Sequence, residues 1–282
     1  MEGIIAHNPV EGKKSWENTG LMIVPRDEKS VLNFQSIRVQ LLNLLEEYKA
    51  IAATKGGLGL KKENGFRELV QKDVGRYDLN LDHLVPGKSS GRELSESEHA
   101  VLQIYMYVES RIRPYLEEIF PQGFIFNQFG AVISSPGTTA QGWHVDSSHL
   151  FVADTPEKEE IYKHIPGYFV TVFCPLFDFS QEIGVSEIAL STHRLTSILG
   201  NKTVEDQYPP QEVCDKFLSA PGVRVIKNQS RIGDIGIMDG RTLHRGGHNV
   251  SQELRPLMYL SFCLPWYHEF PASQSDGRSL FA

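Results

Sequence analysis

The spacing of apolar residues along the first part of the chain is helical. In the segment Ser30–Thr54, apolar side chains recur at intervals of three and four residues, which predicts an amphipathic helix packed on a larger body. The Gly-rich segment Lys55–Gly59 follows directly and should end this helix, because consecutive glycines favour turns.

A second long helix is predicted near residue 100. Ser95 and Glu98 have the spacing of a capping box, in which each side chain satisfies a backbone N–H at the start of a helix. The apolar run Val101–Phe120 follows. Pro114 should kink or split this helix near Arg113, because proline removes a helical hydrogen bond and its ring clashes with the preceding turn.

The pattern changes after Pro121, where short β-branched and aromatic runs alternate with turn residues. Such runs are typical of antiparallel strands in a barrel or sandwich. We predict one α+β domain over residues 1–282, with a mainly helical support region at 1–120 and a barrel at 121–270. The predicted strands are Phe124–Ser134, Trp143–Val152, Tyr168–Phe177, Val185–Leu190, Val223–Lys227, Ile232–Met238 and Leu257–Leu264.

Two charged segments interrupt the predicted strands. They are Asp154–His164 and Asn201–Lys216. Insertions between barrel strands often carry function, so we interpret both segments as candidate lids over the mouth of the barrel.

Composition narrows the classes of partner. The chain is 40% hydrophobic and carries 28 Lys and Arg against 35 Asp and Glu, a net charge of −7. A general affinity for nucleic acid or for an anionic membrane is therefore not expected, and an anionic ligand would need a local basic site. The three cysteines, Cys174, Cys214 and Cys263, form no paired framework, and no apolar run is long enough to span a bilayer. We expect a cytoplasmic protein of unknown oligomeric state.

The first chemical signal is a His-x-Asp pair. In a strand, residues two apart point to the same face, so His144 and Asp146 would present an imidazole and a carboxylate side by side. These are two ligands of a metal site. A chain with 10 His and 35 acidic residues also contains such a pair by chance, so the pair alone decides little.

A third ligand is offered by His244, which lies in the Gly-rich segment Gly233–Asn249. Two His and one carboxylate on one face of an octahedral ion leave three positions open, the arrangement of non-heme Fe(II) oxygenases. The neighbouring Arg241, Arg245 and His248 are equally well explained as solvated loop residues.

Arg255 lies eleven residues beyond His244 and precedes Pro256. A guanidinium group can hold a carboxylate through two parallel hydrogen bonds, so Arg255 is a candidate anion site. The alternative is an arginine at the rim that makes a surface salt bridge.

Taken together, these motifs resemble the phytanoyl-CoA dioxygenase family of Fe(II)/2-oxoglutarate-dependent oxygenases. The resemblance rests on the order of Trp143–Asp146, the segment Asp239–Ser251 with its Gly-Gly-His-Asn sequence, and Arg255-Pro256, and it covers roughly Phe124–Pro265. The segment Gly184–Arg194 is also similar, although Leu190, Ser191 and Thr192 depart from the family pattern.

The resemblance implies a double-stranded β-helix, a jelly-roll variant related to cupins. It implies that His144, Asp146 and His244 bind Fe(II) and that Arg255 binds the distal carboxylate of 2-oxoglutarate. Gln141 matches a position that contacts this co-substrate in several members, and Thr171 is a weaker candidate for the same role. A turn residue and a strand residue facing the core are the respective alternatives.

The implied reaction consumes O2 and 2-oxoglutarate and yields succinate and CO2 while a C–H bond of a small molecule is oxidised. Hydroxylation is the default outcome, with desaturation or oxidative cyclisation as alternatives. The related halogenases lack the carboxylate ligand, so the presence of Asp146 disfavours halogenation.

The candidate substrate residues lie outside these motifs. Arg76 and Tyr77, in the segment Gly75–Leu84, are candidates to hold an anionic or amino-acid-like substrate, and the alternative is a connector that covers one end of the barrel. Two rival functions stay open: a non-catalytic cupin-type ligand-binding barrel, and a metal-dependent hydrolase that uses the same ligands.

Overall fold

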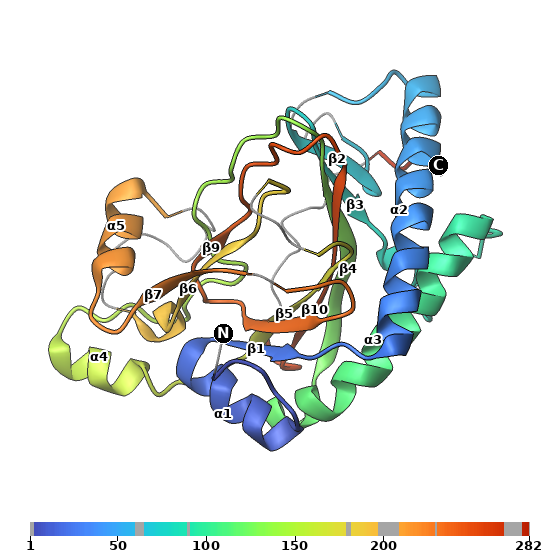
Figure 1. Cartoon of the computed structure of the whole chain (residues 1–282). Helices are drawn as coiled ribbons and strands as arrows, with labels where there is room; N and C mark the ends of the chain where they lie inside the picture. The colour runs from blue at the N-terminus through green and yellow to red at the C-terminus, as the bar shows by residue number, and fades with distance from the viewer. Residues whose placement is uncertain are drawn as a thin grey trace.

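The protein is built from a large sheet and a small sheet that face each other, with two long helices against the outside of the large sheet (Figure 1). The computed structural model describes residues 3–59, 65–88, 91–178, 182–196, 209–228, 230–267 and 278–281. The helices are α1 (Pro9–Thr19), α2 (Glu28–Thr54), α3 (Glu96–Ile119), α4 (Pro156–Tyr162) and α5 (Gln211–Ser219), with short 3₁₀ turns η2 (Asp82–Leu84) and η3 (Thr192–Arg194).

The two predicted long helices are confirmed as α2 and α3. Helix α2 begins at a capping box of Asp27 and Ser30, and α3 begins at the predicted capping box of Ser95 and Glu98. The helices lie side by side over the large sheet (Figure 1), and their apolar faces join its core.

The predicted alternative of a split at Pro114 is wrong, because α3 runs without interruption from Glu96 to Ile119. Pro114 is exposed, so its ring faces solvent, where it displaces no packed neighbour. Ile112 and Leu116 on either side are fully buried, and their packing holds the helix together across the one hydrogen bond that proline removes.

The large sheet contains seven of the described strands, in the order β1-β8-β5-β10-β4-β3-β2, and all of its pairings are antiparallel. The small sheet has the order β7-β6-β9. The strands are β1 (Leu21–Val24), β2 (Leu69–Asp73), β3 (Arg76–Asn80), β4 (Ile125–Ser134), β5 (Phe169–Pro175), β6 (Glu187–Leu190), β7 (Arg224–Lys227), β8 (Ile235–Asp239), β9 (His244–Arg245) and β10 (Arg255–Cys263).

The region predicted to be mainly helical also supplies three strands. Strand β1 pairs with β8 at one edge of the large sheet, and β2 and β3 extend its other edge beyond β4. The N-terminal region is therefore part of the sheet as well as its helical cover.

The predicted strand Trp143–Val152 is not formed. Only His144 pairs in β fashion, through an isolated bridge to His244. Beyond it, the N–H groups of Asp146 and Ser147 both donate to the carbonyl of Gly240, at 2.8 and 2.9 Å. Two successive amides that share one acceptor cannot continue a ladder, because neighbouring amides of a strand point to opposite sides.

The large sheet has an apolar outer face and a mixed inner face. Alternate residues of β4 and β10, such as Ile133 and Met258, are buried against the helices in the main core. Their neighbours in sequence face the small sheet. On the β5 and β8 side this inner face is apolar, with Phe173 and Met238 packed on Ile188 of the small sheet. On the β3 and β4 side it is polar, with buried Arg76, Asp78 and Ser134.

The charged segments predicted as lids are only partly seen. Asp154–His164 contains α4, which has no buried residue, and residues 201–208 lie outside the described part of the chain. Helix α5 packs Cys214 and Phe217 against the outside of the small sheet. The lid role of both segments stays a prediction.

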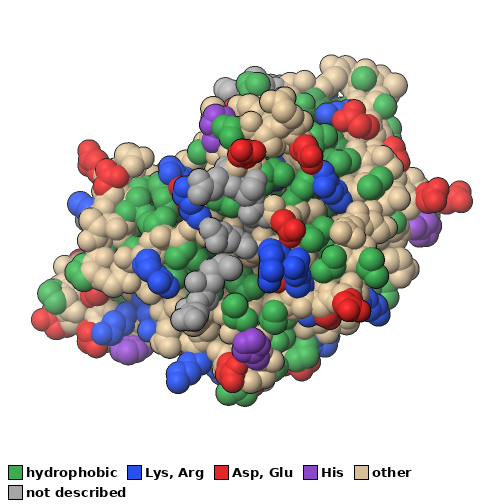
Figure 2. Space-filling model, in the orientation of Figure 1, with side chains coloured by type: hydrophobic (Ala, Val, Ile, Leu, Met, Phe, Trp, Pro, Cys, Tyr) green, Lys and Arg blue, Asp and Glu red, His purple; other side chains and the backbone are tan. Residues whose placement is uncertain are grey.

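The surface and the cysteines agree with the composition. On the face in Figure 2, acidic and basic side chains are interspersed rather than separated by sign. The three cysteines are buried thiols. Among the described residues, no helix combines the length and the apolar character that crossing a membrane requires.

Candidate metal centre

The three predicted ligands lie on two segments that run antiparallel to each other. Residues 141–147 precede strand β5, and residues 240–246 follow strand β8. Gln141 N donates to Gly246 O at 2.9 Å, and His144 and His244 exchange both backbone hydrogen bonds at 2.9 Å. These bonds bring the His-x-Asp pair and the distal histidine, a hundred residues apart in sequence, to adjacent positions.

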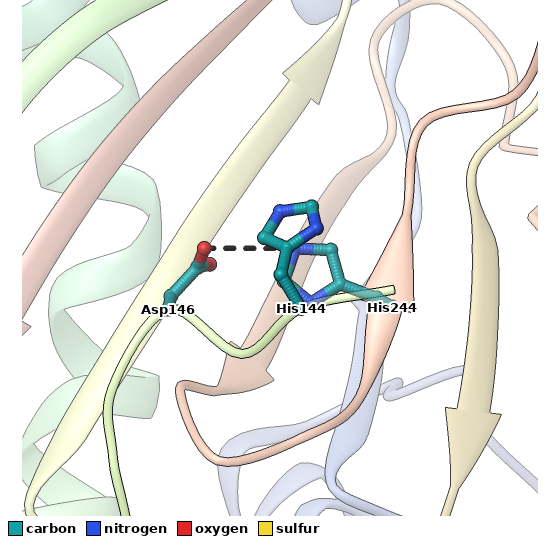
Figure 3. Close-up of side chains that lie close together, drawn as sticks. All are labelled: His144, Asp146 and His244. Carbon is teal, nitrogen blue, oxygen red and sulfur yellow. Dashed lines mark ion pairs between the residues drawn. The ribbon is translucent and has the colours of Figure 1, made fainter. Parts of the chain in front are cut away.

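The side chains form one compact cluster. Each of His144, Asp146 and His244 offers a ligand atom, and these atoms lie within 4.8 Å of one another. The imidazole centroids are 4.3 Å apart, and His244 Nε2 is 3.6 Å from Asp146 Oδ1. Figure 3 shows the carboxylate pointing toward both imidazoles. All three are only partly buried, so the cluster is accessible from outside.

Backbone carbonyls fix the orientation of both imidazoles in the same way. His144 Nδ1 lies 3.0 Å from Gly142 O, and His244 Nδ1 lies 3.0 Å from Thr242 O. A carbonyl can only accept, so Nδ1 carries the proton in each ring and Nε2 keeps its lone pair for a metal. Metal-bound histidines commonly show this pattern.

Thr171 fixes the carboxylate. Its hydroxyl donates to Asp146 Oδ2 at 2.7 Å, and strand β5 positions it beneath the ligand. Burial opposes ionisation of Asp146, but His244, His144 and this hydrogen bond together hold its pKa below the usual value. Burial and the neighbouring His244 lower the pKa of His144 to about 3. The cluster thus favours a carboxylate and a neutral imidazole, the forms that bind metals.

Arg255 is buried at the start of β10, with 4% of its surface exposed. Its guanidinium donates to Ser134 Oγ at 3.2 Å and to the carbonyls of Gly184 and Gly247. Among the described residues it forms no ion pair with a carboxylate. Burial and the nearby charge of Arg76 lower its pKa to about 10. The predicted surface salt bridge is therefore not observed.

Gln141 lies beside Arg255. Its Oε1 accepts from Gly246 N at 3.0 Å. A Cβ atom on Gly246 would come within 2.6 Å of Gln141 Oε1 and 3.2 Å of Arg255 Nη2, so both side chains meet over this glycine. The structure brings Gln141 and Arg255 together at Gly246, two residues after His244 in the sequence.

The two predicted substrate residues lie on opposite faces of β3. Arg76 points to the inner face and is 3% exposed. Tyr77 points outward, packs against the main core and lies under Lys49 Nζ of α2, 4.3 Å from its ring centroid. Because adjacent strand residues face opposite ways, only Arg76 shares a face with the candidate site.

A polar chain on the inner face was missed by the sequence reasoning. Lys72 Nζ lies 2.6 Å from Asp78 Oδ2, Tyr259 donates to Asp78 Oδ1 at 3.0 Å, and Gln128 donates to Tyr259 at 3.1 Å. Gly130 makes room for Tyr259, since a Cβ there would lie 2.5 Å from the phenol oxygen. The available signal was the alternation of polar and apolar residues in β3 and β10.

Comparison with known proteins defines the fold. No protein-family profile matches the chain. Among solved structures, EctD from S. alaskensis in its apo form has a TM-score of 0.59 at 14% identity, over 96% of this chain and 85% of that chain. The non-heme α-ketoglutarate-dependent carbocyclase SnoK from nogalamycin biosynthesis has a TM-score of 0.57 at 15% identity, over 90% and 83%.

A third structure was solved with bound ligands. The epimerase SnoN, in complex with Fe3+, α-ketoglutarate and nogalamycin RO, has a TM-score of 0.55 at 14% identity, over 93% of this chain and 92% of that chain. At these identities the likeness establishes architecture. The chain has the predicted α+β architecture with a cupin-like double-stranded β-helix.

Proposed function

We propose that this protein is a non-heme Fe(II)/2-oxoglutarate-dependent oxygenase that oxidises a C–H bond of a small molecule. The observation that carries the proposal is the His144, Asp146 and His244 cluster beside a buried arginine that has no carboxylate partner among the described residues. The sequence resemblance to the phytanoyl-CoA dioxygenase family and the fold shared with SnoK and SnoN support it.

The donor set fits Fe(II). Two imidazoles and one carboxylate on one side of an ion suit non-heme iron, and the hydrogen bonds of both Nδ1 atoms direct each Nε2 toward the ion. When bound, the iron would supply the activation of dioxygen and the oxidation of the substrate C–H bond. The protein supplies the ligands and fixes their directions.

Arg255 fits the co-substrate. A buried guanidinium without a counter-ion is unfavourable, and 2-oxoglutarate would bring a carboxylate to it. Ser134 and Gln141 flank the guanidinium and can orient that carboxylate. The segment Gln141–Asp146 connects this position in the chain to the candidate metal ligands.

The hydrolase and ligand-binding alternatives account for less of the site. A zinc hydrolase or a binding barrel could use the same three ligands, but neither explains a buried arginine beside them. Asp146 favours hydroxylation, desaturation or cyclisation over halogenation. A small-molecule substrate, anionic or amino-acid-like, and a cytoplasmic location complete the proposal, with no nucleic-acid or membrane partner.

Anaerobic binding tests this proposal. Metal-free protein is titrated with Fe(II), and 2-oxoglutarate is then added while the visible absorption is recorded. We expect one Fe(II) per chain and a new charge-transfer band that needs both components. His144→Ala should abolish the band, whereas His99→Ala, at an exposed position, should retain it. Absence of Fe(II) binding by the wild-type protein would contradict the proposal.

A further inference from the structure

Arg76 and Arg255 occupy equivalent positions on either side of Ser134. In the register of the large sheet, Ser134 of β4 pairs with Arg76 of β3 on one side and with Arg255 of β10 on the other. Residues paired across antiparallel strands point to the same face, and adjacent strands lie about 4.8 Å apart. Two buried guanidinium groups therefore project from the same face of the sheet, with one serine between them.

Two carboxylates of the described residues lie near Arg76, and each has other surroundings to satisfy it. Asp78, two residues along β3 on the same face, is engaged by Lys72 and Tyr259. Asp73 lies 3.8 Å from Arg76 Nη1, and its side chain is 49% exposed, so water screens the contact. Arg255 has no carboxylate contact among the described residues. This part of the inner face therefore holds two guanidinium groups, and the charge of Arg76 acts on Arg255.

Burial and the charge of Arg76 both act on Arg255. Its pKa is lowered to about 10, first by burial and second by the charge of Arg76. A guanidinium is otherwise charged under all ordinary conditions. An anion bound between the two arginines would relieve both effects.

We propose that Arg76 is a second co-substrate residue, which binds the distal carboxylate of 2-oxoglutarate together with Arg255 and sets the preference for a dicarboxylate. This inference rests on the proposed function. Arg76 was predicted to hold the substrate. It lies on the same face of the sheet as Arg255 and pairs with the same residue, Ser134, which favours a role in co-substrate binding instead. One carboxylate can accept hydrogen bonds from two guanidinium groups through its separate lone pairs.

A purely structural role for Arg76 makes a different prediction. Arg76 Nη2 donates to the carbonyl of Thr139 at 2.6 Å, and Thr139 lies two residues before Gln141. If this contact alone mattered, its loss would weaken binding of any 2-oxo acid that depends on this loop, with or without a distal carboxylate. Arg76→Gln keeps an N–H donor and removes the charge, whereas Arg76→Lys keeps the charge and removes the planar fork.

The experiment measures co-substrate affinity by calorimetry on the Fe(II)-loaded protein without oxygen. The probes are 2-oxoglutarate and 2-oxopentanoate, which has the same chain length and no distal carboxylate. We expect Arg76→Gln to raise the Kd for 2-oxoglutarate about tenfold or more and to leave the Kd for 2-oxopentanoate within about twofold. Arg76→Lys should fall between Arg76→Gln and the wild type. Arg38→Gln, which removes an ion pair with Glu253 on the surface, should behave as wild type.

The outcomes separate the two levels of the proposal. If Arg76→Gln binds 2-oxoglutarate as the wild type does, Arg76 is not a co-substrate residue and the proposed function stands. If both probes weaken equally, Arg76 acts through the loop at Thr139 and the inference is overturned. If the wild-type protein binds no 2-oxoglutarate, the proposed function itself fails.

Discussion

Thr171 and Asp146 are joined by a hydrogen bond of 2.7 Å from the threonine hydroxyl to carboxylate Oδ2. The bond ties a residue of strand β5 to a residue of the irregular segment that follows His144. With Oδ2 engaged, Oδ1 lies 3.6 Å from His244 Nε2. Thr171 was predicted as a weaker co-substrate residue, and the structure shows that its hydroxyl holds one oxygen of the Asp146 carboxylate.

Thr171→Val should therefore weaken Fe(II) binding. Valine has the same shape and cannot donate, so the carboxylate would lose its fixed direction. Loss of such a supporting bond lowers metal affinity by about tenfold to a hundredfold. Thr171→Ser, which keeps the hydroxyl, is the matched control and should stay within about threefold of wild type. Anaerobic Fe(II) titration measures both, and equal affinity of the valine variant and the wild type would refute this role.

Arg255→Gln should separate co-substrate binding from metal binding. Arg255 contacts Ser134 and two backbone carbonyls and none of the three metal ligands. We expect Fe(II) affinity within about twofold of wild type and a Kd for 2-oxoglutarate raised at least a hundredfold, since hydrogen bonds between charged groups contribute about 1.5 to 3 kcal/mol each. A large loss of Fe(II) affinity would instead assign Arg255 a structural role.

Gly246→Ala tests the contact between Gln141 and Arg255. The new Cβ would come within 2.6 Å of Gln141 Oε1 and 3.2 Å of Arg255 Nη2, which must displace at least one of them. The expected result is a weaker affinity for 2-oxoglutarate, by about fivefold to fiftyfold, with Fe(II) affinity retained. If affinity for 2-oxoglutarate is unchanged, the co-substrate does not lie against this glycine.

Two buried histidines outside the metal cluster predict sensitivity to acid. Burial is the main reason that the pKa of His149 is lowered to about 3 and that of His193 to about 4. Arg241 and Asp239, which form a buried ion pair at 2.7 Å, act on both with opposite signs. In the unfolded chain, both histidines would titrate near pH 6.5.

Between about pH 6.5 and pH 4, the unfolded chain therefore binds protons that the folded protein does not, and folding becomes less stable as pH falls. Each histidine contributes a slope of up to about 1.4 kcal/mol per pH unit in this window. Urea unfolding of metal-free His149→Gln should show a shallower dependence on pH than the wild type. His99→Gln, at an exposed position, should leave the slope unchanged, and an unchanged slope in His149→Gln would contradict the prediction.

Local patterns predicted much of the fold and the residues that cluster at the candidate metal site. The three- and four-residue spacing in Ser30–Thr54 predicted α2, and the Ser95 and Glu98 capping box predicted the start of α3. His144 and Asp146 were found from their spacing of two. Both side chains reach the same cluster although the strand predicted around them is absent, because the bridge to His244 and the bonds of Asp146 to Gly240 and Thr171 fix the segment.

The parts that were missed depend on pairing between distant segments. Arg76, Asp78 and Asn80 alternate in β3 as the polar face of a surface strand would, but β3 packs this face inward beside β4. Nothing local distinguishes an inward polar face from an outward one. Arg76 and Arg255 each pair with Ser134 but lie far apart in sequence. Only the register of the sheet shows that they are neighbours.

Succinate formation tests the central claim most directly. Protein purified without oxygen is loaded with Fe(II) and 2-oxoglutarate, oxygen is admitted, and succinate is measured with and without a library of small molecules. We predict succinate above the enzyme-free background from the wild type, an increase with at least one library compound, and loss of both in Asp146→Ala. Absence of succinate from Fe(II)-loaded wild-type protein under all of these conditions would contradict the assignment as an oxygenase.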